Sequence, residues 1–205
     1  MSNHALEILA STWTTGVALD YRKGLVVSES SLMSVWYHHL RIAFKESSYQ
    51  VFTEPALYHR QDADERYTRY RPDIVVGREG ADGRHVAAVV EIKWVPFCYP
   101  DYLGDLNKLA NLDRAADGGY SATVCPKRGK EYPFPQEQKQ HFVIDKNTRF
   151  IFAVVGKEES EALDTDKVRE CVGRGGADRK RFSHFSAKAL ATGREFPEFV
   201  ACNEL

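Results

Sequence analysis

Apolar and polar residues alternate along the chain with two periods, one typical of helices and one of strands. Where apolar residues recur every three or four positions, one face of a helix is predicted. Two such stretches come first: Asn3–Arg22, stopped by Gly24, and a second helix from the Ser28 N-cap to about Lys45. The same pattern predicts later helices at Asp101–Ala116 and Ser160–Val172.

Runs of β-branched and aromatic residues predict the strands. Asp73–Gly77 and His85–Trp94 flank a glycine-rich turn, so they are expected to form a hairpin. If that turn centres on Asp82, Asp73 lies opposite Glu91. Further strands are expected at Tyr49–Tyr58, Tyr120–Val124, Phe142–Ile144, Arg149–Val155 and Phe182–Phe185. The pair around residues 145–147 resembles a second hairpin.

The order of these elements is helix, helix, strand, hairpin, helix, strand, helix, strand, which predicts an α/β fold with a mixed sheet flanked by helices. A chain of 205 residues is expected to form a single domain, residues 1–205. Residues 59–72 read as a polar loop. Residues 118–147 carry Lys127, Arg128 and Lys130 and are either a substrate-binding insertion or an ordinary surface loop.

The predicted hairpin gathers charged residues on one patch of the sheet. Because side chains alternate along a strand, Glu91 and Lys93 share the face of Asp73, while Val90 and Ile92 point into the core. Two adjacent carboxylates repel each other unless a cation lies between them. Mg²⁺ prefers such oxygen ligands, and a neighbouring lysine can hold a water and meet a phosphate charge. The alternative is a salt-bridged surface of an ordinary hairpin.

Pro72-Asp73, followed by Glu91-Ile92-Lys93, resembles the P-D…(D/E)-x-K signature of the restriction-endonuclease-like nuclease superfamily. The resemblance implies a core of helix, three strands, helix and strand over about residues 28–155, with an extra N-terminal helix and C-terminal additions. It implies a metal-dependent nuclease in which Asp73 and Glu91 bind Mg²⁺, for which Mn²⁺ substitutes. The backbone carbonyl of Ile92 is a further expected ligand, and Lys93 assists the attacking water.

Glu29 is the third candidate carboxylate. It lies on the apolar stripe of the second predicted helix, three residues before Leu32 and seven before Trp36. It either complements the positive end of the helix dipole or serves the metal site, as a glutamate on the first core helix does in many members of the superfamily. The adjacent His38 and His39 point about 100° apart on the helix, so satisfied structural histidines are expected rather than a metal pair.

Candidate nucleic-acid contacts precede the hairpin. Arg66, Arg69 and Arg71 interleave with tyrosines, a combination suited to phosphate contact and base stacking, although a solvated face is equally compatible. By resemblance, Lys108 on the helix after the E-x-K strand is expected to reach a phosphate. The alternative is that Lys108 and Asp105, three positions apart, form only a surface pair.

Composition adds bounds on class and location. The net charge of −1 advertises no polyanion partner globally, so any nucleic-acid surface must come from local clustering. No apolar run approaches the roughly 20 residues of a membrane span, and no signal peptide is evident. The four widely spaced cysteines are expected to be reduced thiols in a cytoplasmic protein. A homodimer is left open.

Three functions remain after this reading. The first is a metal-dependent nuclease acting on nucleic acid, with DNA favoured over RNA. The second is a catalytically inactive binding module of the same fold. The third is an interaction protein in which the same charges form a salt-bridge cluster. Because Asp73, Glu91 and Lys93 are all present, the first is preferred.

Overall fold

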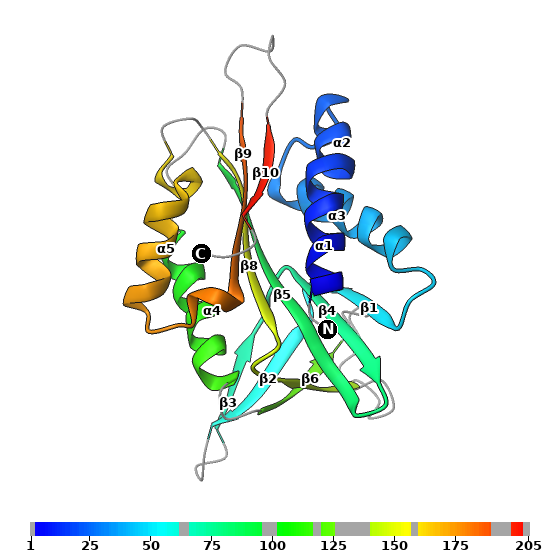
Figure 1. Cartoon of the computed structure of the whole chain (residues 1–205), viewed down its shortest axis with the longest axis vertical. Coiled ribbons are helices and arrows are strands. Elements are labelled where there is room, and N and C mark those ends of the chain that lie inside the picture. Colours follow the sequence, from blue (N-terminus) through cyan, green and yellow to red (C-terminus); the bar gives the residue numbers. More distant parts are fainter. Residues whose placement is uncertain are drawn as a thin grey trace.

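The strands of the protein join in one mixed sheet, with helices on both of its faces (Figure 1). The computed structural model describes residues 3–61, 66–95, 102–116, 120–125, 140–156, 160–189 and 198–202. The strands in those ranges are β1 (Tyr49–Thr53), β2 (Ala56–Gln61), β3 (Arg66–Tyr70), β4 (Ile74–Gly80), β5 (Gly83–Val95), β6 (Tyr120–Cys125), β7 (Gln140–Ile144), β8 (Arg149–Gly156), β9 (Phe182–Lys188) and β10 (Phe199–Cys202).

The helices fall into two groups, one on each face of the sheet (Figure 1). The first group is α1 (Asn3–Ser11), the π-helical segment η1 (Thr12–Val17), α2 (Ala18–Arg22) and α3 (Glu29–Ala43). The second is α4 (Leu103–Ala116), η3 (Glu161–Leu163), α5 (Thr165–Arg174) and η4 (Arg179–Arg181). The α/β class with a mixed, helix-flanked sheet is therefore confirmed. Within the described ranges, no helix is long and apolar enough to cross a membrane.

The N-terminal helices form one hydrophobic layer because their apolar stripes meet over the sheet. Trp13 and Trp36 are fully buried with ring centroids 4.9 Å apart, and the indole of Trp36 donates to Thr12 Oγ1 at 3.0 Å. The Ser28 side chain caps α3, as predicted, by accepting from the backbone of Ser31. The helix ends at Ala43 rather than Lys45.

The two adjacent histidines have different surroundings, and one of them joins two helices. His39 Nε2 lies 2.9 Å from Asp20 Oδ2, so it ties α3 to α2, while His38 is exposed. The His39 ring lies so close to Gly16 that a Cβ there would approach it to 2.7 Å, and the N-terminal helix therefore needs glycine at this position.

β5 is the centre of the sheet. It pairs with β4 along one edge and runs parallel to β8 along the other. The predicted register holds near the strand ends, where Ile74 faces Val90 and Val75 faces Val89. A bulge after Val76 shifts the register by one residue toward the turn, so Gly80 faces Gly83. The bulge leaves the end of the hairpin that carries Asp73 and Glu91 in the expected pairing.

The predicted strand Tyr49–Tyr58 is wrong in one respect: it is two strands. Glu54 adopts a positive φ of 42° before Pro55, and the chain turns there. β1 pairs with β4, whereas β2 pairs with β3 and β6. The stretch expected to be a polar loop is therefore largely a β2–β3 hairpin, with residues 62–65 outside the described residues. The backbone N–H of Glu54 donates to the carbonyl of Asp73 at 2.8 Å, so the two ends of the segment between β1 and β4 are hydrogen-bonded to each other.

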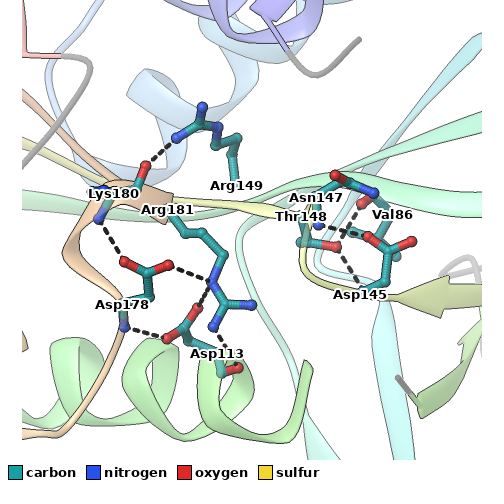
Figure 2. Close-up of polar contacts among 9 residues, drawn as sticks. All are labelled: Val86, Asp113, Asp145, Asn147, Thr148, Arg149, Asp178, Lys180 and Arg181. Carbon is teal, nitrogen blue, oxygen red and sulfur yellow. Dashed lines mark hydrogen bonds and ion pairs between the residues drawn. The ribbon is translucent and has the colours of Figure 1, made fainter. Parts of the chain in front are cut away.

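The predicted hairpin of Phe142–Ile144 with Arg149–Val155 is also wrong. β7 and β8 both run parallel to β5, one after the other along the same edge, so the chain bends between them without reversing. Asp145 and Thr148 secure that bend, because Thr148 donates to the carbonyl of Val86 on β5 at 2.8 Å (Figure 2). β6 pairs with β7, and the basic residues at 127, 128 and 130 lie outside the described residues.

The C-terminal third departs from prediction at its boundaries. Asp164 caps α5, which runs from Thr165 to Arg174, after a short 3₁₀ turn. The last predicted strand extends to Lys188, and β10 adds an antiparallel edge strand that the sequence did not indicate. Directly before β9, Arg181 pairs with the buried Asp113 of α4, Nε to Oδ1 at 2.6 Å (Figure 2).

His184 is the one histidine in the described residues that lies fully inside the second helical layer. Its Nε2 is 2.9 Å from the carbonyl of Ala162, its Nδ1 is 2.9 Å from Thr165 Oγ1, and its ring stacks on Phe152. Burial lowers the pKa of His184 to about 4, with the hydrogen bond to Ala162 opposing the shift. The imidazole is therefore neutral in the folded protein at neutral pH.

This histidine should make the protein acid-labile. Because its folded-state pKa lies below the unfolded value of about 6.5, the unfolded chain binds the proton first, and stability falls as pH drops from about 6.5 to 4. We expect a loss of about 2–3 kcal/mol from this group over that window. Urea melts of wild type and His184→Asn at pH 7 and pH 4.5 measure it. An equal loss in both proteins would contradict the assignment.

Candidate functional site

Asp73 and Glu91 come together where β4 begins and β5 approaches its end. Asp73 precedes the first residue of β4, and its Oδ2 accepts a hydrogen bond of 2.6 Å from the backbone N–H of Ile92. Glu91 is only 6% exposed, although it is charged at neutral pH in water, and its Oε1 accepts a hydrogen bond from the Tyr70 hydroxyl. Val90 and Ile92 are buried in the opposite layer, as predicted.

The electrostatics of this pair are unfavourable without a cation. Burial, together with the charge of Asp73, raises the pKa of Glu91 to about 8, against the hydrogen bond from Tyr70. Burial likewise raises the pKa of Asp73 to about 6, opposed by the bond from Ile92, with the charge of Glu29 adding to the rise. Burial and the charge of Glu91 raise the pKa of Tyr70 well above its usual value, so its hydroxyl keeps its proton and donates.

Glu29 begins α3 and turns toward the sheet. Its Oε2 accepts a hydrogen bond of 3.2 Å from the backbone N–H of Trp94 near the end of β5. Its charge acts on both Asp73 and Lys93. The structure thus brings Glu29 to the same end of β5 as the other candidate residues, on the side of the N-terminal helices.

Lys93 faces α4 and meets a carboxylate that the sequence did not single out. Its Nζ lies 2.7 Å from Oδ2 of Asp105, while Nζ of Lys108 lies 2.7 Å from Oδ1 of the same residue. Asp105 is 6% exposed. Its pair with Lys108 is therefore not the surface pair that was expected. Burial alone would lower the pKa of Lys93, but the hydrogen bond and charge of Asp105 outweigh it, and the pKa is raised.

The candidate nucleic-acid residues lie on different elements near this site. Arg66 and Arg69 lie on β3, where Arg69 pairs with Tyr58 and Arg66 with Gln61, and their side chains are not among those described. Arg71 is exposed between β3 and β4, two residues before Asp73. Lys108 is exposed on α4, its side chain 55% accessible. Tyr70 does not stack outward but bonds to Glu91.

The donor set fits a hard divalent cation. In the described part of the chain, no three His, Cys, Asp or Glu side chains are arranged so that they could hold a metal ion as they stand. Mg²⁺ needs fewer protein ligands, because it is commonly bound by one or two carboxylates, waters and substrate phosphate. The half-buried Asp73 and the buried Glu91 are neighbouring carboxyl groups whose raised pKa values a positive charge would bring down.

Two residues of the site were missed by sequence reasoning. A signal for Asp105 was present: with Leu109, Leu112 and Ala116 it shares one face of α4 at spacings of four and three, and all four are buried. The same argument had picked out Glu29. Tyr70 had no comparable signal. Its contact with Glu91 depends on β3 returning toward β5, and the polar composition of residues 59–72 favours a loop rather than a strand.

Comparison of the chain with protein-family models, with curated proteins and with solved structures found no match. The resemblance to restriction-endonuclease-like nucleases therefore rests on the residues of this chain and their arrangement.

Proposed function

We propose that the protein is a Mg²⁺-dependent nuclease with a restriction-endonuclease-like core, formed by α3, β1, β4, β5, α4 and β8 in chain order. The observation that supports it most is the half-buried Asp73 next to the buried Glu91, two carboxyl groups with raised pKa values beside Lys93. Folding such a pair into the interior is costly. This cost is explained if the two carboxyl groups bind a cation that contacts a phosphodiester.

In this proposal each residue has a separate role. Asp73 and Glu91 hold the ion, the Ile92 carbonyl is a further ligand, and Glu29 acts directly or through water. The bound Mg²⁺ would supply Lewis-acid stabilisation of charge on the phosphate and on the attacking water. Lys93 orients that water and stabilises the negative charge that develops at phosphorus. Water adds to phosphorus and one P–O ester bond breaks, leaving a phosphate monoester and a hydroxyl end.

Nucleic acid would approach over β3 and α4. Arg66, Arg69 and Arg71 would contact backbone phosphates from one side and Lys108 from the other, each contributing to affinity through counterion release. DNA is the proposed substrate, ahead of RNA.

A binding or interaction module is the second candidate, and one observation favours it. Lys93 is already paired with Asp105, so the charges of the site form a network without any ligand. A protein that uses these charges only for structure or binding needs no metal for its activity.

An incubation with nucleic acids separates the two candidates. The protein is mixed with circular DNA, linear DNA and RNA in Mg²⁺, Mn²⁺ or EDTA, and products are followed on gels beside gel-shift measurements. The nuclease cleaves at least one substrate with either metal and none in EDTA. Retention of DNA without cleavage under all three conditions would identify a binding module, and neither binding nor cleavage would leave an interaction protein.

Glu29→Gln tests the third carboxylate. If Glu29 binds the ion directly or through a water, Glu29→Gln should need about three- to tenfold more Mg²⁺ for half-maximal cleavage. Residues that contact a metal only through its ligands or waters commonly contribute that much or more to its affinity. Its urea melt should change little, since an amide oxygen can still accept from Trp94. Metal titrations of both proteins provide the measurement. An unshifted titration with a stability loss of about 0.3–1 kcal/mol would assign Glu29 to the helix dipole alone.

A further inference from the structure

We propose that Asp105 is a positioning residue that holds the ammonium of Lys93 in place for phosphodiester cleavage. This inference rests on the proposed nuclease function. Asp105 itself touches neither the carboxylate pair nor, in the proposal, the reacting atoms. It acts through Lys93, from the first turn of α4, across the interface between α4 and β5.

The geometry gives Asp105 two fixed partners. One carboxylate oxygen contacts Lys93 and the other contacts Lys108, both at 2.7 Å, so neither oxygen can turn away without breaking a contact. The side chain of Asp105 is 8% exposed and that of Lys93 is 23% exposed, against 55% for Lys108. The buried part of the bridge is therefore the part that contains Lys93, and Lys108 covers it from the solvent side.

This arrangement restrains Lys93 in a way that a surface ion pair does not. A lysine side chain has a flexible four-carbon stem and loses much rotamer entropy when it is fixed. An exposed pair rarely holds such a chain in one geometry, whereas a carboxylate buried on a helix and bound at both oxygens can. An ammonium has three donor protons, so the contact with Asp105 leaves two for water and phosphate.

The restraint also answers a problem of charge. Without Asp105, Lys93 would be drawn toward Glu91 and Glu29, whose charges both act on it. A lysine bound directly to those carboxylates would occupy the place where the cation is proposed to lie. Asp105 draws Lys93 to the α4 side of β5, so the ammonium remains next to the metal ligands without replacing the ion between them.

The experiment compares Asp105 with a matched residue of the same helix. Asp113 is also a buried aspartate of α4, 1% exposed, and it pairs with Arg181 at the far end of the helix (Figure 2). Asp105→Asn removes the buried carboxylate charge that pairs with Lys93 and Lys108, and Asp113→Asn removes the one that pairs with Arg181, so only the first involves Lys93. Asp105→Glu and Asp113→Glu form a second pair that keeps the charge and moves it by one methylene, in case either asparagine variant fails to fold.

Asp105→Asn and Asp105→Glu should lower kcat by about 10- to 100-fold, the cost expected of displacing a catalytic group by about 1 Å, while KM stays within about threefold. The Asp113 variants should lose stability but keep kcat within about twofold of wild type. The proposal would be overturned if Asp105→Asn and Asp113→Asn had equal kcat, or if Asp105→Glu and Asp113→Glu did. A loss expressed wholly in KM would also overturn it, because it would mean that Asp105 serves binding.

A measurement independent of turnover separates this inference from the nuclease function. Ammonium protons of a lysine held in a partly buried ion pair exchange slowly enough to give an NMR correlation to Nζ, whereas those of a solvated lysine do not. The correlation assigned to Lys93, by its disappearance in Lys93→Met, should persist in Asp113→Asn and vanish in Asp105→Asn. Its persistence in Asp105→Asn, or absence from wild type, would overturn the inference. If the correlation is lost in Asp105→Asn but the wild-type protein cleaves no nucleic acid, only the nuclease function is refuted.

Discussion

Lys93→Ala is expected to lower kcat for phosphodiester cleavage by about 10²–10³-fold, the usual cost of removing one preorganised donor from a developing negative charge. Affinity for the nucleic acid should stay within a few-fold of wild type, because Lys93 is 23% exposed and acts at one phosphate only. Single-turnover cleavage gives the rate, and gel shifts in Ca²⁺ or EDTA give the affinity.

The matched control for this variant is Lys167→Ala. Lys167 is an exposed lysine of α5 that pairs with Glu161, away from the carboxylate pair, so its removal should change neither rate nor affinity measurably. If Lys93→Ala cleaves as fast as Lys167→Ala, the charged patch at the end of β5 is not a catalytic site. If affinity falls as steeply as rate, Lys93 belongs to substrate binding.

Asp73→Asn and Glu91→Gln are expected to stabilise the metal-free protein. Both carboxylates have folded-state pKa values above their ordinary ones, about 6 and about 8, so the folded protein binds more protons than the unfolded chain. The stability that the two protonated carboxyl groups contribute to the folded protein is fully present below about pH 4 and is lost as pH rises through 6 and 8. At pH 7 without divalent ions, each neutral variant should therefore gain about 1–3 kcal/mol in the free energy of unfolding.

Metal ions should remove this difference if the proposed site holds Mg²⁺. An ion bound by the folded wild type and not by the unfolded chain should raise the wild-type melting temperature and leave Asp73→Asn and Glu91→Gln nearly unchanged. Glu79→Gln, at an exposed acid near the turn of the same hairpin, should alter neither stability nor metal response. Urea melts from pH 4 to 8, with and without Mg²⁺, provide the test. A metal-free Glu91→Gln less stable than wild type at pH 7 would contradict the charge-repulsion account.

The parts of the structure that the sequence predicted are those governed by local periodicity. The hairpin placed Asp73 beside the end of β5, and the apolar stripe of α3 placed Glu29 toward the sheet, because both depend on a single repeating spacing. The start of α3 followed from its capping residue, Ser28. Asp105 was within reach of the same reasoning, and a polar residue on an apolar stripe was simply given a surface role.

The parts that were missed depend on pairing between distant segments. Glu54-Pro55 shows that the chain breaks, but not that β1 and β2 then join different neighbours. The turn residues near Asp145 favour a reversal, and only the parallel pairing of β8 with β5 decides against it. Tyr70 reaches Glu91 for the same reason, because the return path of β3 is set by β2 and β6 rather than by its own residues.

The hydrogen bond between the Glu54 N–H and the Asp73 carbonyl has a consequence for how the protein can change over time. It joins the two points at which the chain leaves the central strands and returns, so the base of the intervening segment is held together, while β2 and Tyr70 attach the segment to β6 and Glu91. Lengthening a closed loop costs little, about 0.6 kcal/mol for each doubling. The connection between β2 and β3 can therefore be lengthened while Asp73 keeps its backbone position. In the proposed nuclease, target contacts beside Arg66 could then change without moving the residues proposed to act in hydrolysis.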